Sequence, residues 1–329
     1  MIKKEKKVIL IVGATGYIGS EVVNLLKDKN FDIICTYRGN IKKELFEENN
    51  CITWFDVDWK KENIILKFLK NISRVDIIIS CIASRDGGRL NSNLIDYKAN
   101  RYLLQFAEEK KINQFIMISA ICVQKPRLFF QHAKLKFEKE LVNSNIPFSI
   151  IRPTAFFKSL SGQIKRVQNG KKFVIFKNGN LTKCKPISSK DLSNYVFNCI
   201  DNKEKLNKIL PVGGPGPAVN SRQIGEMIFR QLGKKPKFKK ISPDIFKIFI
   251  LFLYPISFFS VTIQDKIEFM KIAYYYATES MLVYDFEKNR YSDKKTPEYG
   301  EDYLSDFFKY YLNNSKEDSV EVLKNNRLF

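Results

Sequence analysis

The chain has 329 residues, of which 44% are hydrophobic and 13% aromatic, so it can bury the core of one large α/β domain or of two intimate ones. Its formal net charge of +21 favours anionic partners (nucleic acid, acidic lipid or a small anionic ligand), unless the lysines are simply spread over a solvated surface. No helix is densely basic and no nucleic-acid motif is present, so we predict no nucleic-acid partner.

Cysteine and histidine usage limits the chemistry further. None of the six cysteines forms C-x-x-C, and at least four lie in apolar runs, which indicates core thiols in a reducing compartment. His132 is the single histidine, so a multi-histidine metal site is excluded, and we predict no resident metal. Seven residues precede the first predicted strand, too few for a signal or transit peptide. We therefore expect a bacterial, organelle-encoded or already trimmed chain.

Short apolar runs alternate with helically patterned segments through the first half of the chain. Strands are predicted at 8–12, 31–38, 51–58, 75–84, 114–124 and 147–153, and helices after the glycine turn at 13–19 and at 63–72, 94–110 and 133–144. Strands that alternate with helices at this pitch predict an α/β fold with a Rossmann-type doubly wound parallel sheet.

Beyond residue 155 the pattern is less regular. Helices are predicted at 192–200 and 221–232, with a strand from 209 that ends in a Gly/Pro turn. We expect a cofactor-binding Rossmann domain over 1–155. A smaller, mostly helical substrate-binding part should cover 156–329, interleaved with the sheet because a later strand can return to it.

Residues 245–261, IFKIFILFLYPISFFSV, form the most apolar run of the chain. Three interpretations remain open: an apolar helix over a substrate pocket, a peripheral contact with a membrane surface, or a true span. The run has 17 residues, with Lys247 near its start and Pro255 inside it, whereas a span usually needs about 20 apolar residues.

The stretch GATGYIG at 13–19 directly follows a strand and opens a helix. In that context its G-x-x-G-x-x-G pattern predicts a dinucleotide site, because glycine lets the backbone approach a pyrophosphate and the helix N-terminus offers N–H groups to it. The residues expected to meet the cofactor here are Gly13, Thr15, Gly16, Tyr17, Ile18 and Gly19.

The end of the second strand indicates which cofactor is bound. It reads CTYRGN, with Arg38 and no acidic residue where NAD-binding proteins place Asp or Glu for the ribose 2′-hydroxyl. A guanidinium pairs with a 2′-phosphate, so we predict NADPH, with help from the Thr36 hydroxyl. Asp56 and Val57 are expected near the adenine, and Cys81 and Ala83 beside the cofactor at the carboxyl edge of the sheet.

The order of elements resembles the short-chain dehydrogenases/reductases, whose extended and atypical, NmrA-like members carry this glycine pattern. That resemblance implies a catalytic serine at Ser119 and a catalytic lysine at Lys134, which would hold the nicotinamide ribose. Phe130 stands where the Tyr-x-x-x-Lys motif has its proton-donating tyrosine. Ser119 could instead satisfy a backbone group at the strand end.

Longer strings carry a narrower resemblance. ISAICVQKP at 118–126 and RPTAFFKSL at 152–160 are unusual, and with SCIASRDGG (80–88), CKPISSKDL (184–192), LPVGGPGPA (210–218), YYYATESMLVYD (274–285) and TPEYGEDYLSDFF (296–308) the chain resembles the NADPH-dependent divinyl chlorophyllide a 8-vinyl reductases. The resemblance covers nearly the whole chain, in order. It is weakest at 245–262, and His132 replaces an expected arginine.

This resemblance implies reduction of the C8 vinyl group of 3,8-divinyl chlorophyllide or protochlorophyllide to ethyl, in a phototrophic bacterium or a plastid stroma. Reducing a conjugated vinyl group develops charge on carbon, so no oxyanion needs the missing tyrosine. The expected contacts of this flat tetrapyrrole and its propionate are Lys125, Phe129, Phe130, Phe156, Phe157 and Lys158. The rival interpretations are a reductase of another aromatic or quinone substrate, and a non-catalytic NADPH-binding regulator or assembly factor.

Overall fold

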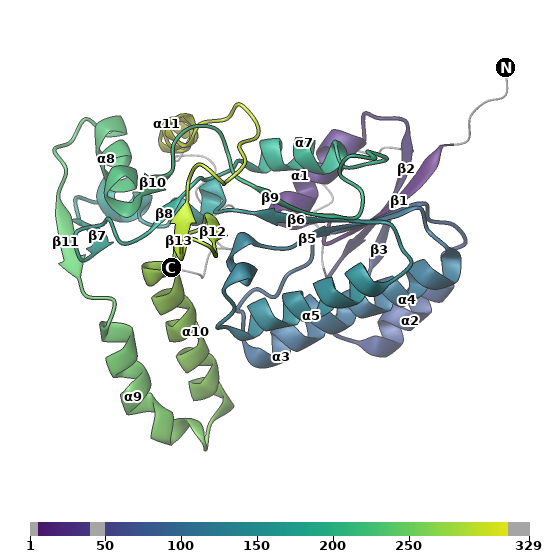
Figure 1. Ribbon diagram of the computed structural model, residues 1–329, viewed down its shortest axis with the longest axis horizontal. Helices are drawn as coiled ribbons and strands as arrows, with labels where there is room; N and C mark the ends of the chain where they lie inside the picture. The colour runs from purple at the N-terminus through teal and green to yellow at the C-terminus, as the bar shows by residue number, and fades with distance from the viewer. Residues whose placement is uncertain (1–5, 40–49, 315–329) are drawn as a thin grey trace. The chain divides into compact units, whose positions relative to one another are not determined.

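The computed structural model describes residues 6–39 and 50–314 (Figure 1). The chain forms two compact units. The first comprises Met1–Arg152 and Leu192–Leu210, and the second Pro153–Asp191 and Pro211–Phe329. The chain therefore passes from one unit to the other three times, and the domain boundary predicted at residue 155 lies close to the first passage.

A seven-stranded sheet forms the centre of the first unit and confirms the predicted fold class. Its strands are β1 (Lys7–Val12), β2 (Phe31–Tyr37), β3 (Ile52–Asp56), β4 (Ile77–Ser80), β5 (Gln114–Ile118), β6 (Phe148–Pro153) and β9 (Lys208–Val212), in the spatial order β3-β2-β1-β4-β5-β6-β9. The pairings from β3 through to β6 are parallel. The strand order reverses between β1 and β4, which is where doubly wound sheets bind their ligands.

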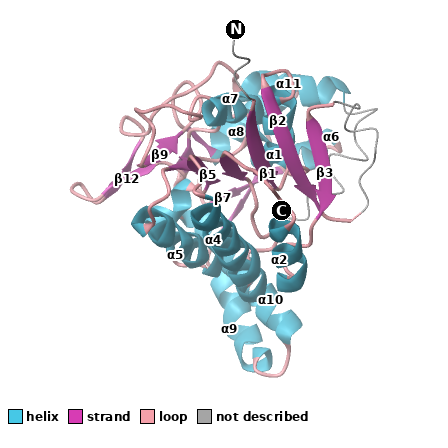
Figure 2. Cartoon of the chain, turned by 90° about the vertical axis from the view of Figure 1, so that its right-hand side faces the viewer, coloured by secondary structure: helices cyan, strands magenta, loops and turns pink. Residues whose placement is uncertain are grey.

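Helices cover both faces of this sheet (Figures 1 and 2). One face carries α2 (Glu62–Lys70), α4 (Asn100–Lys110) and α5 (Phe129–Asn143), and the other carries α1 (Tyr17–Leu26) and α7 (Ser189–Phe197). The core under α2, α4 and α5 includes Leu10, Phe115 and Phe137, and the rings of Phe115 and Phe137 lie 5.7 Å apart. Strands buried on both faces explain the continuous apolar runs of the sequence.

Several predicted boundaries were wrong: the strand predicted over 75–84 is β4, which ends at Ser80, the helix predicted over 192–200 is α7, which begins at Ser189, and two further differences lie around β5 and α5. The strand predicted over 114–124 ends at Ile118, and residues 121–124 form a 3-10 turn. The helix predicted from 133 begins at Phe129. The Gln131 side chain explains this earlier start, because its Oε1 accepts the backbone N–H groups of Arg127 (2.7 Å) and Leu128 (3.0 Å), which stabilises the first turn of the helix.

The helix predicted over 94–110 is longer and less uniform than expected. It begins with α3 (Arg89–Asn91), continues as a π-helix over Ser92–Ala99 and ends with α4. A π-helix is rare and often occurs at functional sites. This one packs against α5.

The second unit contains several short strands that the sequence pattern did not predict. Its elements are α6 (Ile164–Gln168), β7 (Phe173–Phe176), β8 (Lys183–Cys184), β10 (Val219–Asn220), α8 (Ser221–Gln231), β11 (Phe238–Ile241), α9 (Ile245–Ser257), α10 (Val261–Thr278), β12 (Val283–Asp285), β13 (Arg290–Ser292) and α11 (Leu304–Asn314). Lys185, which is buried, ties distant segments together, because its Nζ lies 2.8 Å from Asp293 Oδ1 and 2.7 Å from Glu298 Oε1.

The apolar run 245–261 forms α9 and the turn into α10, and the two helices pack against each other. Within the described ranges, no helix is both long enough and apolar enough to cross a bilayer.

A buried carboxylate joins α5 to the ends of β5 and β6. Glu138 accepts a hydrogen bond from the Ser119 hydroxyl and forms an ion pair with Arg152, whose Nε lies 3.3 Å from Glu138 Oε1. Removing one partner of a buried ion pair destabilises a fold strongly, whereas replacing both partners costs much less.

We expect Arg152→Met to lower the free energy of unfolding by about 3 kcal/mol, because Glu138 would be left charged and buried. Urea denaturation followed by circular dichroism measures this loss. Glu138→Gln/Arg152→Met removes both charges and should recover much of it. The pair of the exposed Arg101 and the half-buried Glu140, 4.0 Å apart, provides the control, since Arg101→Met should cost less than about 1 kcal/mol. Equal losses in Arg101→Met and Arg152→Met would contradict the argument.

Candidate functional site

The turn between β1 and α1 is built so that three backbone segments nearly touch. Gly13 has φ +83°, and a Cβ placed on it would lie 3.0 Å from the Ile82 side chain and 3.1 Å from the Cys81 carbonyl. A Cβ on Gly19 would lie 2.1 Å from the Gly13 oxygen. Only glycine permits these approaches. The N-cap of α1 is Gly16, which has no side chain to cover the first N–H groups of the helix. The turn therefore fits a pyrophosphate.

The other residues predicted in this turn divide between surface and core. Thr15 and Gly16 are exposed, and Tyr17 is half-buried. Ile18 is buried on the inner side of α1, so it can offer a cofactor only its backbone amide.

The carboxyl ends of β2 and β3 are joined beside Arg38. The Gly39 N–H donates to Asp56 Oδ1 at 3.1 Å, and the Val57 N–H donates to the Tyr37 carbonyl at 2.8 Å. Arg38 is exposed at this corner, whereas Val57 is buried. Asp56 thus helps to close the turn that presents the guanidinium.

Thr36 lies in the core rather than at this corner. It is buried, and its Oγ1 accepts the indole N–H of Trp59 at 3.1 Å. This hydroxyl already has a structural partner, and a direct contribution of Thr36 to cofactor binding stays a prediction.

The end of β4 lies directly against the glycine turn. The Cys81 N–H donates to the Val12 carbonyl at 2.8 Å, and Ala83 two residues further on is exposed. Burial raises the pKa of the Cys81 thiol to about 12. This cysteine therefore stays protonated near neutral pH and contributes backbone and packing rather than a nucleophile.

Lys134 forms a buried ion pair. Its Nζ lies 3.1 Å from Asp96 Oδ1, and both side chains are at most 5% exposed. Asp96 belongs to the π-helix, and it also accepts the Ser84 N–H (3.3 Å) and the Ser84 hydroxyl. Asp96 therefore links Lys134 on α5 to the loop that follows β4, at the carboxyl edge where the glycine turn lies.

A second buried hydrogen bond fixes the π-helix to the sheet. The Ser80 hydroxyl donates to Asn100 Oδ1, and the Asn100 side-chain amide donates to the carbonyls of Ile95 (3.3 Å) and Asp96 (3.2 Å). These bonds satisfy polar groups inside the core and hold the segment that carries Asp96 in place.

Ser119 is placed differently from Lys134. It follows β5, is buried, and donates its hydroxyl to Glu138. Its N–H donates to the Ile151 carbonyl at 2.7 Å. Both polar groups of Ser119 thus have structural partners, and its catalytic role stays a prediction.

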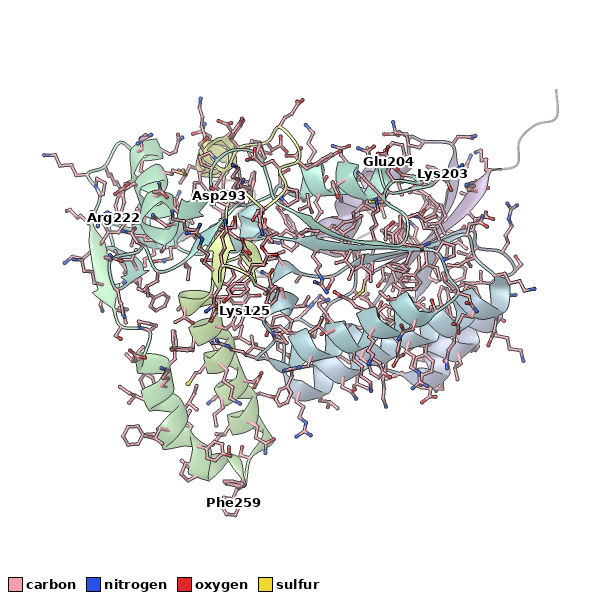
Figure 3. All side chains as sticks on the ribbon, viewed as in Figure 1. Lys125, Lys203, Glu204, Arg222, Phe259 and Asp293 are labelled. Carbon is pink, nitrogen blue, oxygen red and sulfur yellow. The ribbon has the colours of Figure 1, made fainter. Side chains whose placement is uncertain are left out.

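Three of the predicted substrate contacts lie close together in sequence in the first unit. Lys125 follows the 3-10 turn after β5 (Figure 3), and Phe129 and Phe130 begin α5. Phe129 is exposed and lies under the Arg89 guanidinium, 5.5 Å from the ring centre, whereas Phe130 is half-buried. Phe130 precedes Lys134 by four residues, so the two share one face of the helix.

The other three predicted substrate contacts belong to the second unit. Phe156 is half-buried, but Phe157 is only 2% exposed and packs 5.6 Å from the ring of Phe307. That is the environment of a core residue, so a place for Phe157 in a substrate pocket stays a prediction. Lys158 is half-buried, and burial lowers its pKa below the usual lysine value.

The sequence analysis did not identify two buried acids, Asp96, which pairs with Lys134, and Glu138, which accepts the Ser119 hydroxyl. Asp96 lies between Ile95 and Tyr97, and Glu138 follows Phe137, so each is an acid among apolar residues on an inward helix face. An acid at a core-facing position predicts a buried partner. This signal was available without the structure.

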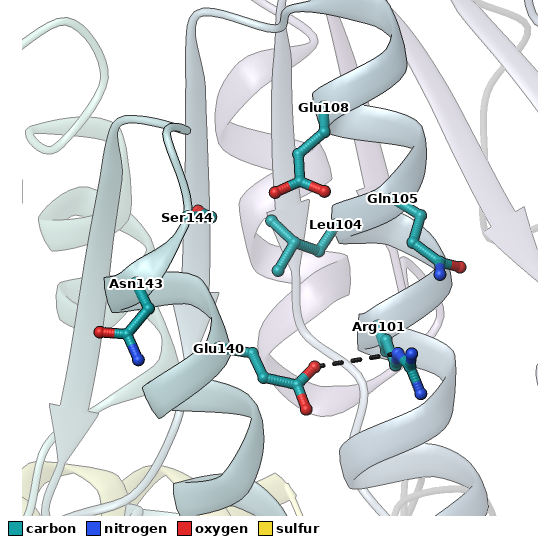
Figure 4. A pocket seen from close by; sticks show the side chains of 7 residues that line it. All are labelled: Arg101, Leu104, Gln105, Glu108, Glu140, Asn143 and Ser144. Carbon is teal, nitrogen blue, oxygen red and sulfur yellow. Dashed lines mark ion pairs between the residues drawn. The ribbon is translucent and has the colours of Figure 1, made fainter.

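An open depression of about 320 Å³ lies between α4 and α5 (Figure 4). Its lining is mostly polar and comprises Arg101, Leu104, Gln105, Glu108, Glu140, Asn143 and Ser144. It includes none of the residues predicted for the site, and it therefore has no part in the candidate site.

Comparison with known proteins agrees with the geometry of the first unit. The NAD(P)H-binding family matches residues 13–203, which contain the glycine turn, Arg38, Asp96 and Lys134. The cofactor is therefore a nicotinamide dinucleotide.

Solved structures support the fold. The NADPH-dependent quinone oxidoreductase QOR2 of Escherichia coli, complexed with NADPH, superposes with a TM-score of 0.65 at 17% identity, over 93% of this chain and 100% of that one. The epimerase Mth375 of Methanothermobacter thermautotrophicus gives 0.67 at 13% identity, over 95% and 94%.

Curated relatives are closer in sequence. The photosystem II assembly factor Ycf39 of Guillardia theta is 23% identical, over 95% of this chain and 98% of its own. The chloroplastic divinyl chlorophyllide a 8-vinyl-reductase of Arabidopsis thaliana is 42% identical over 318 residues, which is 91% of this chain and 75% of its own. A relative this similar over nearly the whole chain shows the family: the chain belongs to the divinyl chlorophyllide a 8-vinyl reductases.

Proposed function

We propose that this protein reduces the C8 vinyl group of 3,8-divinyl chlorophyllide or protochlorophyllide a to an ethyl group, with NADPH as the hydride donor. The observation that carries the proposal is the 42% identity with a reductase of that name over 91% of the chain. The reaction would belong to chlorophyll synthesis, in a plastid stroma or in the cytoplasm of a phototrophic bacterium.

The environment of Lys134 supports a reductase. An ammonium paired with a buried carboxylate is held in one orientation, so it can bind ribose hydroxyls without first being ordered. Asp96 itself is fixed by Ser84. Lys134 would hold the nicotinamide ribose at the carboxyl edge, and Asp96 is the positioning residue behind it.

The side chain of Phe130 supports reduction of a carbon–carbon double bond. Adding hydride to a conjugated vinyl group places negative charge on carbon and into the macrocycle, and protonation at carbon completes the ethyl group. No carbonyl oxygen has to be protonated, so a phenol at this position is dispensable. A phenylalanine suits a flat apolar ring better.

The direct test is incubation of the purified protein with divinyl chlorophyllide a and NADPH, followed by chromatography for the 8-ethyl product. We expect a product that depends on both protein and cofactor. A folded, NADPH-bound protein that makes no product would refute the proposal. Turnover of a quinone in the same preparation would then favour a different reductase, and the absence of any turnover would favour an assembly factor.

We expect Lys134→Met to lower turnover about 10- to 100-fold, since a hydrogen bond from a charged group is worth about 1.5–3 kcal/mol. It should also destabilise the fold, because Asp96 loses its cation. Lys134→Met/Asp96→Asn should recover stability but not turnover.

The control for this pair is Lys139→Met, which changes an exposed lysine of the same helix and should leave both quantities unchanged. If the double variant recovered turnover as well as stability, Lys134 would serve only to neutralise Asp96, and its role at the cofactor would be disproved.

Arg38→Ala should raise the KM for NADPH about 10- to 100-fold and leave the KM for NADH almost unchanged, because the loss is that of an arginine–phosphate contact. Initial rates at varied cofactor concentration measure both constants. Lys60→Ala, another exposed cation in this unit, is the control. Equal KM values for NADPH and NADH in the unchanged protein would refute the assignment of Arg38.

A further inference from the structure

The helix α9 is apolar on all sides, which is unusual for a helix at a protein surface. Of its 13 residues, IFKIFILFLYPIS, only Lys247 is charged. A helix of this composition needs apolar surroundings around its whole circumference. Among the described residues, α10 packs against one side of α9, and Phe176 on β7 contacts its first turn.

The inner side of α9 is fixed by an aromatic contact at one end and by hydrogen bonds at the other. Phe246 lies 5.8 Å from the ring of Phe176 on β7. At the other end, the Gln264 side chain of α10 donates to the Ser257 carbonyl at 2.9 Å, and the Ser257 hydroxyl donates to the Tyr254 carbonyl at 2.6 Å. The hairpin of α9 and α10 therefore has a defined turn. The apolar side chains on its outer side are exposed on a folded helix and not on an unwound helix end.

The outer side of α9 and the turn expose large apolar side chains in a continuous surface. They are Ile245, Ile248, Phe249, Leu251, Phe252, Tyr254, Ile256, Phe258 and Phe259; we call this set the outer face. Exposure is greatest towards the turn, at 71% for Phe252 and 91% for Phe259, which is labelled in Figure 3. A contiguous apolar surface of this kind marks a place where another apolar body binds.

Positive charge flanks the outer face at the start of the hairpin. The segment 234–247 contains six lysines and one acidic residue, Asp244. Lys239 and Lys240 on β11 are exposed, directly before α9. Lysines next to an apolar helix face match anionic lipid headgroups, which they attract over a distance of about a Debye length.

We propose that the outer face binds the surface of an anionic lipid bilayer, with Phe252, Phe258 and Phe259 inserted among the acyl chains and the lysines of 234–247 in the headgroup region. Thirteen residues make a helix of about 20 Å, which suits a helix that enters one leaflet. Aromatic side chains flanked by lysine are typical of interfacial helices. This inference goes beyond the proposed reductase function and does not depend on it.

Binding of the full-length protein to vesicles tests the proposal. The protein should float with vesicles of phosphatidylcholine mixed with phosphatidylglycerol, bind more weakly to phosphatidylcholine alone, and lose part of its binding at high salt. Phe252→Ser/Phe259→Ser should weaken binding about a hundredfold, because the transfer of two large apolar side chains from water into the bilayer no longer contributes to the binding free energy. The matched control is Leu90→Ser/Phe286→Ser, which changes two side chains that are 68% and 70% exposed elsewhere.

A second pair of variants isolates the charge contribution. Lys239→Glu/Lys240→Glu should abolish the preference for phosphatidylglycerol. Lys60→Glu/Lys203→Glu makes the same change in net charge at exposed positions of the first unit and should retain the preference. Equal effects of the two pairs would show only a dependence on net charge and would overturn the assignment.

Insertion itself can be observed with Phe259→Trp. Brominated lipids should quench the introduced indole, and the unchanged protein, whose two indoles are the buried Trp59 and the half-buried Trp54, provides the baseline emission. If the protein bound no vesicles but formed an oligomer that Phe252→Ser/Phe259→Ser made monomeric, the outer face would bind a second copy and the proposal would be wrong. NADPH binding, measured in parallel, shows that each variant is folded.

Discussion

The first unit depends on the burial of one positive and one negative charge at the carboxyl edge of the sheet. Lys134 and Asp96 come from different helices, and removal of either partner would leave the other buried without its ion pair. Their pairing requires that α5 and the π-helix pack closely. It also requires that Ser84 and Asn100 satisfy the groups around them. If Lys134 holds the cofactor as proposed, the contacts that prepare the site are the same ones that stabilise the fold.

The sequence predicted the parts of this arrangement that depend on local pattern. The apolar runs predicted the strands from β1 to β6. The glycine spacing predicted the turn after β1, and in the structure the backbone of Gly13 lies close to that of Cys81. The short strands of the second unit were not predicted, because two to four residues are too few to show a periodicity. Asp96 and Glu138 were missed because a helical pattern locates an acid on a face but does not identify its partner.

Phe130 differs from the family motif, but its surroundings retain the other parts of that motif. In the sequence, Phe130 occupies the position of the tyrosine in the Tyr-x-x-x-Lys motif, which suggests the loss of a proton donor. In the structure it is a half-buried residue four positions before a lysine that is still held by a carboxylate. The polar support of the lysine has been kept although the phenol is absent. That combination is compatible with the proposed reduction of a carbon–carbon double bond, for which the phenol is dispensable.

The three passages of the chain between its units have a consequence for synthesis on the ribosome. The sheet of the first unit takes its last strand, β9, from residues that follow a long excursion into the second unit. When residue 152 has emerged, six parallel strands can pair, but β6 is left with an open edge until residue 212 follows. At translation rates of roughly 5–20 residues per second, that edge is exposed for several seconds. During that interval the nascent chain is open to incorrect strand pairing.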